Sequence, residues 1–394
     1  MTHPKKRLAI VVSHPIQYYA PLYQRLALRN DLVIRVFFTW HGGEAPVQDR
    51  GFGTPVAWDI PLTEGYDFEV VPNLSRNPGT HHFLGLRNPS LVERILEWKP
   101  DAVHVTGWAC LSHLQALWAF HKSQIPVLFR GDSHLLNVSL RGPYWWVKRA
   151  FLKRVYSWPA AFLVVGSANR AYYKTFGVGD ERLHHCPHSI DVVRFAEPAD
   201  RLERESAEWR RNLGIAEGTR VLLFAGKFER TKQPLMLMSA VRSLGTPGLM
   251  LVMVGGGALE AEVIALAAAE PCRFRILPFQ NQSRMPLVYR LGNLFVLPSM
   301  GETWGLAVNE ALACGRPVLV SDRVGCAADV VDATFGRVFP WNDSSAMMKA
   351  VEEITVDPSG VLRLGHAASI RAWAFDTSCA EAGLVESLEG VWSG

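Results

Sequence analysis

Two glutamates in one short stretch are the strongest candidates for chemistry in the sequence. The stretch reads GETWGLAVNEALACGRP, and seven residues separate Glu302 from Glu310 within it. It follows a strand-like apolar run, and the pattern predicts a helix that begins near Trp304 and stops at Gly315. The start of such a helix presents free backbone N–H groups, which suit a diphosphate. Two carboxylates beside that site suit the recognition of sugar hydroxyl groups.

The longer string PSMGETWGLAVNEALACGRPV resembles the glutamate-pair motif of family 4 glycosyltransferases, also called group 1, which have the GT-B fold. The resemblance implies that Glu302 contacts hydroxyl groups of a donor sugar and that Glu310 binds the ribose of a nucleotide. Trp304 stands where phenylalanine is commoner, and it is expected to line the donor site with Gly305 and Leu306. The alternative is a surface helix with two solvated glutamates, which the matching flanks disfavour.

Two lysines follow another apolar run, in the segment FAGKFERTKQP. Two cations at the carboxyl end of a strand suit a pyrophosphate group. By resemblance to the family, Gly226 belongs to the donor site, and Lys227 and Lys232 neutralise the leaving diphosphate. Lysine at 227 replaces the commoner arginine, which keeps the charge but loses the bidentate geometry. The alternative is a pair of ordinary surface cations.

Three glycines, Gly255 to Gly257, follow the apolar run in LVMVGGGALEAEV. A dinucleotide fingerprint needs a further glycine where this chain has Glu260, so a nicotinamide site is not expected. The family resemblance places Gly256 in a turn near the nucleotide, and a tight turn without ligand contact is the alternative. It also places Phe279 and Gln280 at the nucleobase.

Polar residues in the amino-terminal half are candidates for the acceptor side. Ser13, His14 and Gln17 follow the first apolar run, where a parallel strand ends and ligands of α/β proteins bind. A hydrogen-bonded structural histidine is the alternative for His14. In FRGDSH, the family resemblance makes His134 the expected catalytic histidine near the donor sugar, and Asp132 is an alternative base on the acceptor side.

The segment 144–158 combines an apolar stripe with basic residues. Tyr144, Val147, Phe151, Val155 and Trp158 recur at helical spacing, and lysines and arginines lie beside them. Such a helix suits peripheral contact with an anionic membrane that presents a lipid-linked acceptor. An ordinary domain helix with a solvated basic edge is the alternative.

The elements that must position these residues alternate between short apolar runs and helical patterns, which is typical of parallel sheets covered by helices. In the first half the expected strands are 8–12, 33–38, 68–71, 102–105, 127–129 and 161–165, with helices near 19–29, 90–98 and 111–121. In the second half the expected strands are 221–225, 249–254, 274–277, 294–297 and 318–320.

A charged stretch, EPADRLERESAEWRR, interrupts this alternation and predicts a linker that becomes a surface helix. The expected architecture is therefore α/β, with two Rossmann-like doubly wound domains that face a cleft. The first domain is expected to comprise residues 1–195, joined by a carboxyl-terminal helix at 375–394. Residues 196–374 are expected to form the nucleotide-sugar donor domain.

Composition limits the classes of partner. Among 394 residues, 48% are apolar and 20% are charged, and the net charge is only +4, so nucleic acid is not expected. The apolar runs are too short to span a membrane, which predicts a cytoplasmic protein, either soluble or peripheral on the inner face of the membrane. The cysteines and histidines lack metal spacing and no Asp-x-Asp motif is present, so neither a metal nor a cofactor is expected.

The family resemblance implies a retaining glycosyltransferase that moves a sugar from a nucleotide diphosphate sugar to an acceptor hydroxyl. The acceptor is expected to be a sugar or a lipid-linked molecule, in the synthesis of a polysaccharide, glycolipid or glycoconjugate. The alternatives are a non-catalytic nucleotide-sugar-binding protein of the same fold, a sugar-nucleotide epimerase, or a phosphorylase.

Overall fold

The computed structural model describes residues 5–40, 47–48, 55–136 and 142–393. The chain forms two compact units. The first comprises the described residues of 1–45, 60–189 and 377–394, and the second those of 46–59 and 190–376. This division differs from the predicted one, in which the boundary lies between residues 195 and 196 and the segment 46–59 belongs to the first domain.

The first unit is built on a seven-stranded parallel sheet in the order β5-β2-β1-β6-β7-β8-β9. The strands are β1 (Lys6–Val12), β2 (Leu32–Phe38), β5 (Phe68–Val70), β6 (Ala102–Thr106), β7 (Val127–Arg130), β8 (Ala161–Val164) and β9 (Leu183–His185).

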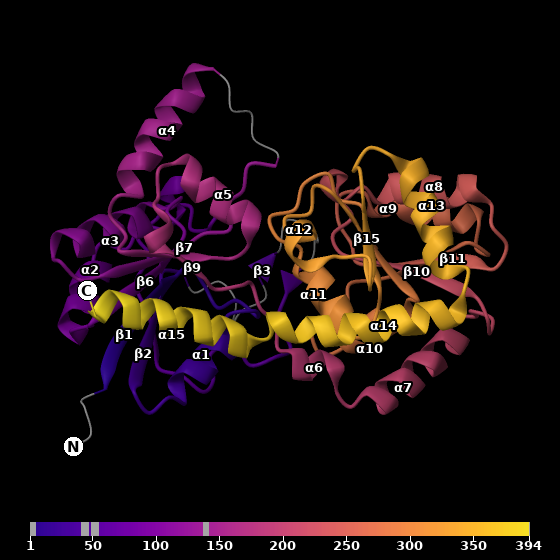
Figure 1. Ribbon diagram of the computed structural model, residues 1–394, viewed down its shortest axis with the longest axis horizontal. Coiled ribbons are helices and arrows are strands. Elements are labelled where there is room, and N and C mark those ends of the chain that lie inside the picture. The colour runs from indigo at the N-terminus through magenta and orange to yellow at the C-terminus, as the bar shows by residue number, and fades with distance from the viewer. Residues whose placement is uncertain (1–4, 41–46, 49–54, 137–141, 394) are drawn as a thin grey trace. The chain divides into compact units, whose positions relative to one another are not determined.

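Both faces of this sheet are covered by helices, because alternate side chains of β1 enter two different cores. Leu8 and Ile10 pack toward α1 (Ala20–Ala27) and α15 (Thr377–Ser393). Ala9 and Val11 face the opposite core, which is covered by α2 (Leu91–Trp98), α3 (Leu111–Lys122), α4 (Pro143–Val155) and α5 (Ser167–Thr175). Because successive side chains of a strand point to opposite faces of the sheet, both sets must be apolar here, which explains the uninterrupted apolar run of β1. The helices that cover the sheet are labelled in Figure 1.

The second unit has a six-stranded parallel sheet in the order β12-β11-β10-β13-β14-β15. The strands are β10 (Arg220–Ala225), β11 (Leu249–Val254), β12 (Phe274–Leu277), β13 (Leu294–Leu297), β14 (Val318–Ser321) and β15 (Gly336–Phe339). One face is covered by α8 (Pro234–Leu244), α9 (Glu260–Ala269) and α13 (Ser344–Thr355). The other is covered by α7 (Ala199–Asn212), α10 (Met285–Leu291), α11 (Leu306–Ala313) and α14 (Pro358–Ala372).

Shorter elements connect these layers. They are the antiparallel pair β3 (Val47–Gln48) and β4 (Pro55–Val56), the helices α6 (Val192–Ala196) and α12 (Ala327–Val330), and the 3-10 turns Phe83–Gly85, Asp180–Arg182, Arg230–Lys232 and Trp373–Phe375.

The expected α/β class with two parallel sheets is confirmed. Every predicted strand is present, with ends that differ by at most two residues. The expected strands omitted β9 and β15, because the sequences LHH and GRVF are short and interrupted by polar residues or glycine. The charged linker is a surface helix, α7, as expected.

Candidate functional site

Two loops run side by side at the carboxyl edge of the second sheet. The Glu302 N–H donates to the Arg323 carbonyl at 3.1 Å, and the Gly325 N–H donates to the Glu302 carbonyl at 3.0 Å. A Cβ atom at Gly325 would lie 2.0 Å from the Thr303 carbonyl oxygen, so only glycine permits this approach. The loop after β14 thereby holds the loop that carries Glu302.

Helix α11 begins directly after this loop. Gly305 is its N-cap with a φ of 97°, in the left-handed region that favours glycine. The amino-terminal end of α11, at Leu306, lies four residues after Glu302, whose carbonyl accepts a hydrogen bond from the neighbouring loop. A helix start carries partial positive charge, which suits an anionic group.

Lys232 and Glu302 form an ion pair, although 69 residues separate them in the chain. The Lys232 Nζ atom contacts Glu302 Oε2, and the two side chains are only 18% and 22% exposed. Lys232 ends the 3-10 turn after β10, and Lys227 is half-buried in the same loop. The structure thus brings together the predicted sugar-binding carboxylate and one predicted diphosphate-binding cation.

The predicted glycines Gly226 and Gly256 lie in loops that touch. A Cβ atom at Gly255 would lie 2.0 Å from the Gly226 carbonyl oxygen, and one at Gly226 would lie 3.3 Å from Lys232 Cδ. The Gly256 carbonyl accepts a hydrogen bond from the Phe228 N–H at 2.7 Å. Gly226 and Gly255 therefore allow two loops to pack closely beside Lys232, and Gly256 contributes its carbonyl to the contact.

Glu310 and Trp304 are both buried, unlike Glu302. Glu310 is 2% exposed, and its Oε2 accepts a hydrogen bond of 2.5 Å from the Tyr289 hydroxyl on α10. Trp304 is 4% exposed, and its indole N–H donates to Asn309 Oδ1 at 3.1 Å. The Trp304 side chain packs inside the unit, so its contribution to a site is to position the start of α11.

Phe279, expected with Gln280 at the nucleobase, lies beside a residue that sequence reasoning missed. The rings of Trp58 and Phe279 meet edge to face with centroids 6.4 Å apart. The segment around Trp58 is held there because the Ser283 N–H donates to Asp59 Oδ1 at 3.0 Å. Trp58 lies more than 200 residues before Phe279, and no local sequence pattern indicates this pairing.

A second missed residue, Gln233, ties three loops together. Its side-chain amide donates to the Pro298 carbonyl at 2.7 Å and to the Trp341 carbonyl at 3.0 Å. Its backbone φ is 56°, which is uncommon for a residue other than glycine. The Gln-Pro pair is a sequence signal for a helix start, since Pro234 is the first residue of α8, but it does not indicate the hydrogen bonds of the Gln233 side chain.

In the first unit, Ser13 and His14 form a local pair. Ser13 Oγ lies 2.9 Å from His14 Nδ1, and the His14 ring meets Trp40 edge to face with centroids 5.5 Å apart. Burial lowers the pKa of His14, which keeps the imidazole neutral near pH 7. Gln17 is half-buried in the same loop.

Arg130 at the end of β7 is buried, whereas the residues that follow the strand are more accessible. Arg130 is 3% exposed and donates to the carbonyls of Cys186 and Pro187, each at 3.1 Å. Asp132 is exposed, and its Oδ2 lies 3.9 Å from Nε2 of the buried His188. His134 is half-buried, and its Nδ1 accepts from the Leu136 N–H at 3.2 Å.

Burial lowers the pKa of His188 well below its usual value, and the nearby Arg130 lowers it further. His188 is not among the residues predicted to form the site, so its position beside Asp132 is a feature that sequence reasoning missed. Among the described residues, no group of three or more His, Cys, Asp or Glu side chains is placed to hold a metal ion.

Comparison with known families identifies the chain on both units. Residues 205–370 match the family described as "Glycosyl transferases group 1", and residues 58–194 match "Glycosyltransferase Family 4". The chain belongs to this glycosyltransferase family. The resemblance of the glutamate motif is thereby confirmed at the level of the family.

Relatives of this glycosyltransferase family member include curated bacterial proteins. The D-inositol 3-phosphate glycosyltransferase of Nocardia farcinica is 30% identical over 233 residues, which are 56% of this chain and 50% of that protein. The protein of the same name from Streptomyces bingchenggensis is 29% identical over 54% of this chain and 50% of that protein. The chain thus aligns with about half the length of these relatives.

Solved structures share the fold over nearly the whole chain. Sucrose-phosphate synthase from Thermosynechococcus elongatus has a TM-score of 0.73 at 17% identity, and the match covers 99% of this chain and 100% of that one. Anabaena HepE, in complex with UDP and glucose, has a TM-score of 0.70 at 15% identity, and the match covers 98% of this chain and 99% of that one. These likenesses establish the GT-B fold of this family member.

Proposed function

We propose that this protein is a glycosyltransferase that moves a sugar, with retention of anomeric configuration, from a nucleotide diphosphate sugar to an acceptor hydroxyl. The observation that carries the proposal is the Lys232–Glu302 ion pair beside the start of α11. In this ion pair, a carboxylate that can bind sugar hydroxyl groups lies next to a cation that can bind the diphosphate, and both are at the carboxyl-terminal ends of the strands. Family membership supports the same chemistry.

Departure of the diphosphate develops negative charge on the leaving oxygen. Lys227, Lys232 and the N-terminal end of α11 stabilise that charge, and their fixed positions reduce the reorganisation needed during the reaction. Glu302 holds hydroxyl groups of the donor sugar, while Glu310 binds the ribose. This arrangement uses protein cations for the diphosphate and needs neither a metal nor a cofactor.

The acceptor is assigned to the first unit. Ser13, His14 and Gln17 bind it, and His134 or Asp132 approaches the reacting hydroxyl. UDP-glucose is the first donor to test, because HepE was solved with UDP and glucose. D-inositol 3-phosphate is the first acceptor to test, because it is named in relatives. The same sites suit sugar or lipid-linked acceptors in the synthesis of a polysaccharide, glycolipid or glycoconjugate.

Donor binding is tested by calorimetric titration with UDP-glucose, GDP-mannose and ADP-glucose. We expect one of the three to bind, and Lys232→Gln to weaken that binding by about tenfold or more, because a charge-assisted contact is lost. Lys349→Gln is the matched control, since Lys349 is an exposed lysine on α13. Binding that is unchanged in Lys232→Gln would contradict the assignment of the diphosphate site.

Retention is tested by NMR of the first-formed product. Transfer from an α-linked donor is expected to give an α-linked product. A β-linked first product would contradict the retaining assignment while leaving the transfer itself intact.

The peripheral membrane contact is also a proposal, and α4 carries it. Only part of the predicted apolar stripe is exposed. Val155 is fully buried, whereas the exposed fractions of Tyr144, Val147 and Phe151 are 78%, 70% and 42%. Trp146 adds a further exposed ring, and the sequence of α4 places lysines and arginines beside the exposed residues. An anionic lipid surface matches this combination of apolar rings and positive charge. No helix among the described residues is long and apolar enough to cross a membrane.

Flotation with vesicles tests this contact. The protein is expected to float with vesicles that contain phosphatidylserine at low salt, and less with neutral vesicles, because part of the attraction is electrostatic. Trp146→Ser with Phe151→Ser is expected to abolish flotation, whereas Trp118→Ser, at an exposed tryptophan of α3, leaves it unchanged. Equal flotation of all variants would overturn the role of α4.

A further inference from the structure

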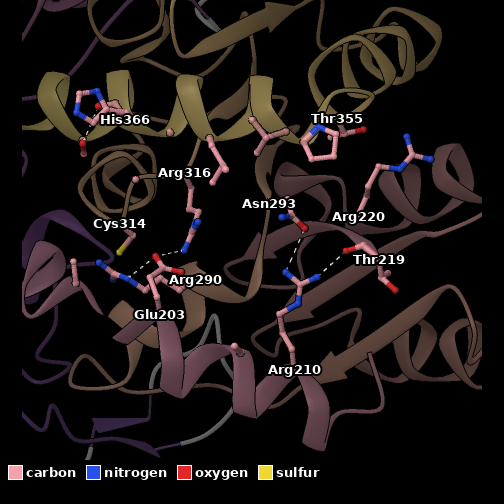
Figure 2. A pocket seen from close by; sticks show the side chains of 18 of the residues that line it. Glu203, Arg210, Thr219, Arg220, Arg290, Asn293, Cys314, Arg316, Thr355 and His366 are labelled. Carbon is pink, nitrogen blue, oxygen red and sulfur yellow. Dashed lines mark hydrogen bonds and ion pairs between the residues drawn. The ribbon is translucent and has the colours of Figure 1, made fainter. Parts of the chain in front are cut away.

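A pocket of about 1040 Å³ lies within the second unit, between α7 on one side and α14 on the other (Figure 2). Its lining includes five arginines and three glutamates, an excess of two positive charges. We call it the arginine pocket after Arg210, Arg211, Arg220, Arg290 and Arg316. None of the donor-site residues predicted from the sequence lines it.

One carboxylate in the arginine pocket faces several guanidinium groups. Arg290 Nε lies 3.2 Å from Glu203 Oε1, and an Arg316 Nη atom contacts the same oxygen. Figure 2 shows Glu203 between these two arginines. The pKa of Arg210 is lowered by burial and then by the charge of Arg316, while Glu203 raises it. Positive charge here is therefore only partly balanced by the protein, and such charge is costly to bury.

Arg210 and Arg290 are held in place by hydrogen bonds to backbone carbonyls and to Asn293, so a ligand would not have to order these two side chains. Arg210 donates to the Thr219 carbonyl at 2.7 Å and to Asn293 Oδ1 at 3.3 Å (Figure 2). Arg290 is 2% exposed as a side chain and donates to the Phe195 carbonyl at 2.8 Å. Fixed guanidinium groups suit the tetrahedral oxygens of a phosphate better than flexible lysines do.

The rest of the lining suits a small polar molecule. Ala199, Ala313 and Gly365 leave space, and Thr219 and Ser369 offer hydroxyl groups. The volume is at the upper end of the range of small-molecule sites, about 300–1,000 Å³, and exceeds what one phosphate group fills. The remaining space matches a polyol or a sugar attached to the phosphate.

We propose that the arginine pocket binds a small organic phosphate, a phosphorylated sugar or polyol, whose phosphate group lies among Arg210, Arg290 and Arg316. This site goes beyond the proposed transfer reaction and does not depend on it. The ligand displaces Glu203 as the partner of the arginines, because a phosphate carries more negative charge than one carboxylate.

The arginine pocket lies at the amino-terminal ends of the strands of the second sheet, and the donor site lies at their carboxyl-terminal ends. Arg220 is the first residue of β10, and Arg316 lies just before β14. The donor-site residues Gly226 and Glu302, in contrast, follow the carboxyl-terminal ends of β10 and β13. Six residues of β10, at about 3.3 Å each, separate the two ends by about 20 Å. A ligand that contacts Arg316 therefore does not contact Lys232.

Calorimetric titration with ribose 5-phosphate tests the proposal, with ribose as the control ligand. We expect the intact chain to bind ribose 5-phosphate but not ribose, and Lys232→Gln to bind it equally well. Arg316→Gln is expected to weaken binding by about tenfold or more, because it removes a guanidinium group that contacts phosphate. Glu203→Gln is expected to strengthen binding by roughly threefold or more, because it removes the competing carboxylate.

Arg204→Gln is the matched control, since Arg204 is an exposed arginine of α7 outside the pocket. If Arg316→Gln fails to fold by circular dichroism, Arg210→Gln replaces it. The proposal is overturned if ribose 5-phosphate does not bind at millimolar concentration to either the natural chain or Glu203→Gln. It is also overturned if binding is lost in Lys232→Gln but kept in Arg316→Gln, which would place the ligand in the donor site.

Discussion

Glu310 shows how a charged residue is held inside the second unit. Its carboxylate is buried and accepts the Tyr289 hydroxyl at 2.5 Å, so removal of that hydroxyl leaves a buried acceptor with one partner fewer. Tyr289→Phe is expected to lower the free energy of unfolding by about 1–3 kcal/mol. Urea denaturation measures this, with Tyr144→Phe as the control because Tyr144 is exposed. Equal losses in both variants would contradict the role of the hydroxyl.

Two buried histidines make the first unit sensitive to acid. Burial lowers the pKa of His104 to about 3 and that of His113 to about 4. The unfolded chain therefore binds more protons below pH 6.5, and the free energy of unfolding falls as the pH drops from 6.5 toward these values. We expect a loss of about 3 kcal/mol between pH 7 and pH 4 from each histidine.

His104→Leu separates this effect from general acid unfolding. Neither ring nitrogen of His104 has a hydrogen-bond partner among the described residues, so the substitution removes the titration without breaking a side-chain hydrogen bond. The variant is expected to lose less stability than the natural chain between pH 7 and pH 4 in urea titrations. An unchanged pH profile would show that His104 does not contribute.

At the scale of elements, the loops after β13 and β14 depend on one glycine. Gly325→Ala places a Cβ atom 2.0 Å from the Thr303 carbonyl oxygen, so the loop that carries Glu302 must shift. We expect a loss of roughly 1–3 kcal/mol in unfolding free energy and weaker donor binding.

Gly390→Ala is the control for this substitution. Gly390 lies in α15, where the nearest atom to an added Cβ is 3.7 Å away. Alanine there is expected to stabilise the helix by about 0.5–1 kcal/mol. Thermal denaturation compares the two variants, and a Gly325→Ala protein as stable as the natural chain would refute the close-packed loop.

The elements themselves were largely predictable, because buried parallel strands require apolar runs such as Leu249–Val254. The contacts between residues of the candidate site were harder to predict from the sequence. The sequence motif indicated Glu302 and Lys232 as separate candidates, whereas their ion pair exists because β10 and β13 are neighbours in the sheet. Trp58 beside Phe279 was missed because tertiary folding alone brings those segments together.

At the scale of the whole molecule, the chain returns to the first unit at its carboxyl end. Helix α15 places Ala380, Leu384 and Leu388 in the core beside α1, and each is at most 1% exposed. Glu381 adds an ion pair of 2.8 Å to Arg25. The first unit was expected to include a carboxyl-terminal helix at 375–394, and the helix observed in this unit is Thr377–Ser393.

Truncation after Asp376 tests the importance of this helix. Loss of three buried apolar side chains is expected to remove several kcal/mol of stability, at about 1.5–3 kcal/mol for each large side chain. The first unit should then unfold at lower temperature and bind a hydrophobic dye. A truncated chain with an unchanged melting profile would contradict the packing of α15.

Sugar transfer itself is the central claim, and one assay tests it most directly. The natural chain, Glu302→Gln and the surface control Glu353→Gln are incubated with UDP-glucose, GDP-mannose or ADP-glucose and an acceptor panel that includes D-inositol 3-phosphate. Release of nucleoside diphosphate is measured together with the glycosylated product. We predict coupled release and product with one donor, a loss of at least about a hundredfold in Glu302→Gln, and full activity in Glu353→Gln. Full activity in Glu302→Gln, or no release from any donor, would contradict the proposal.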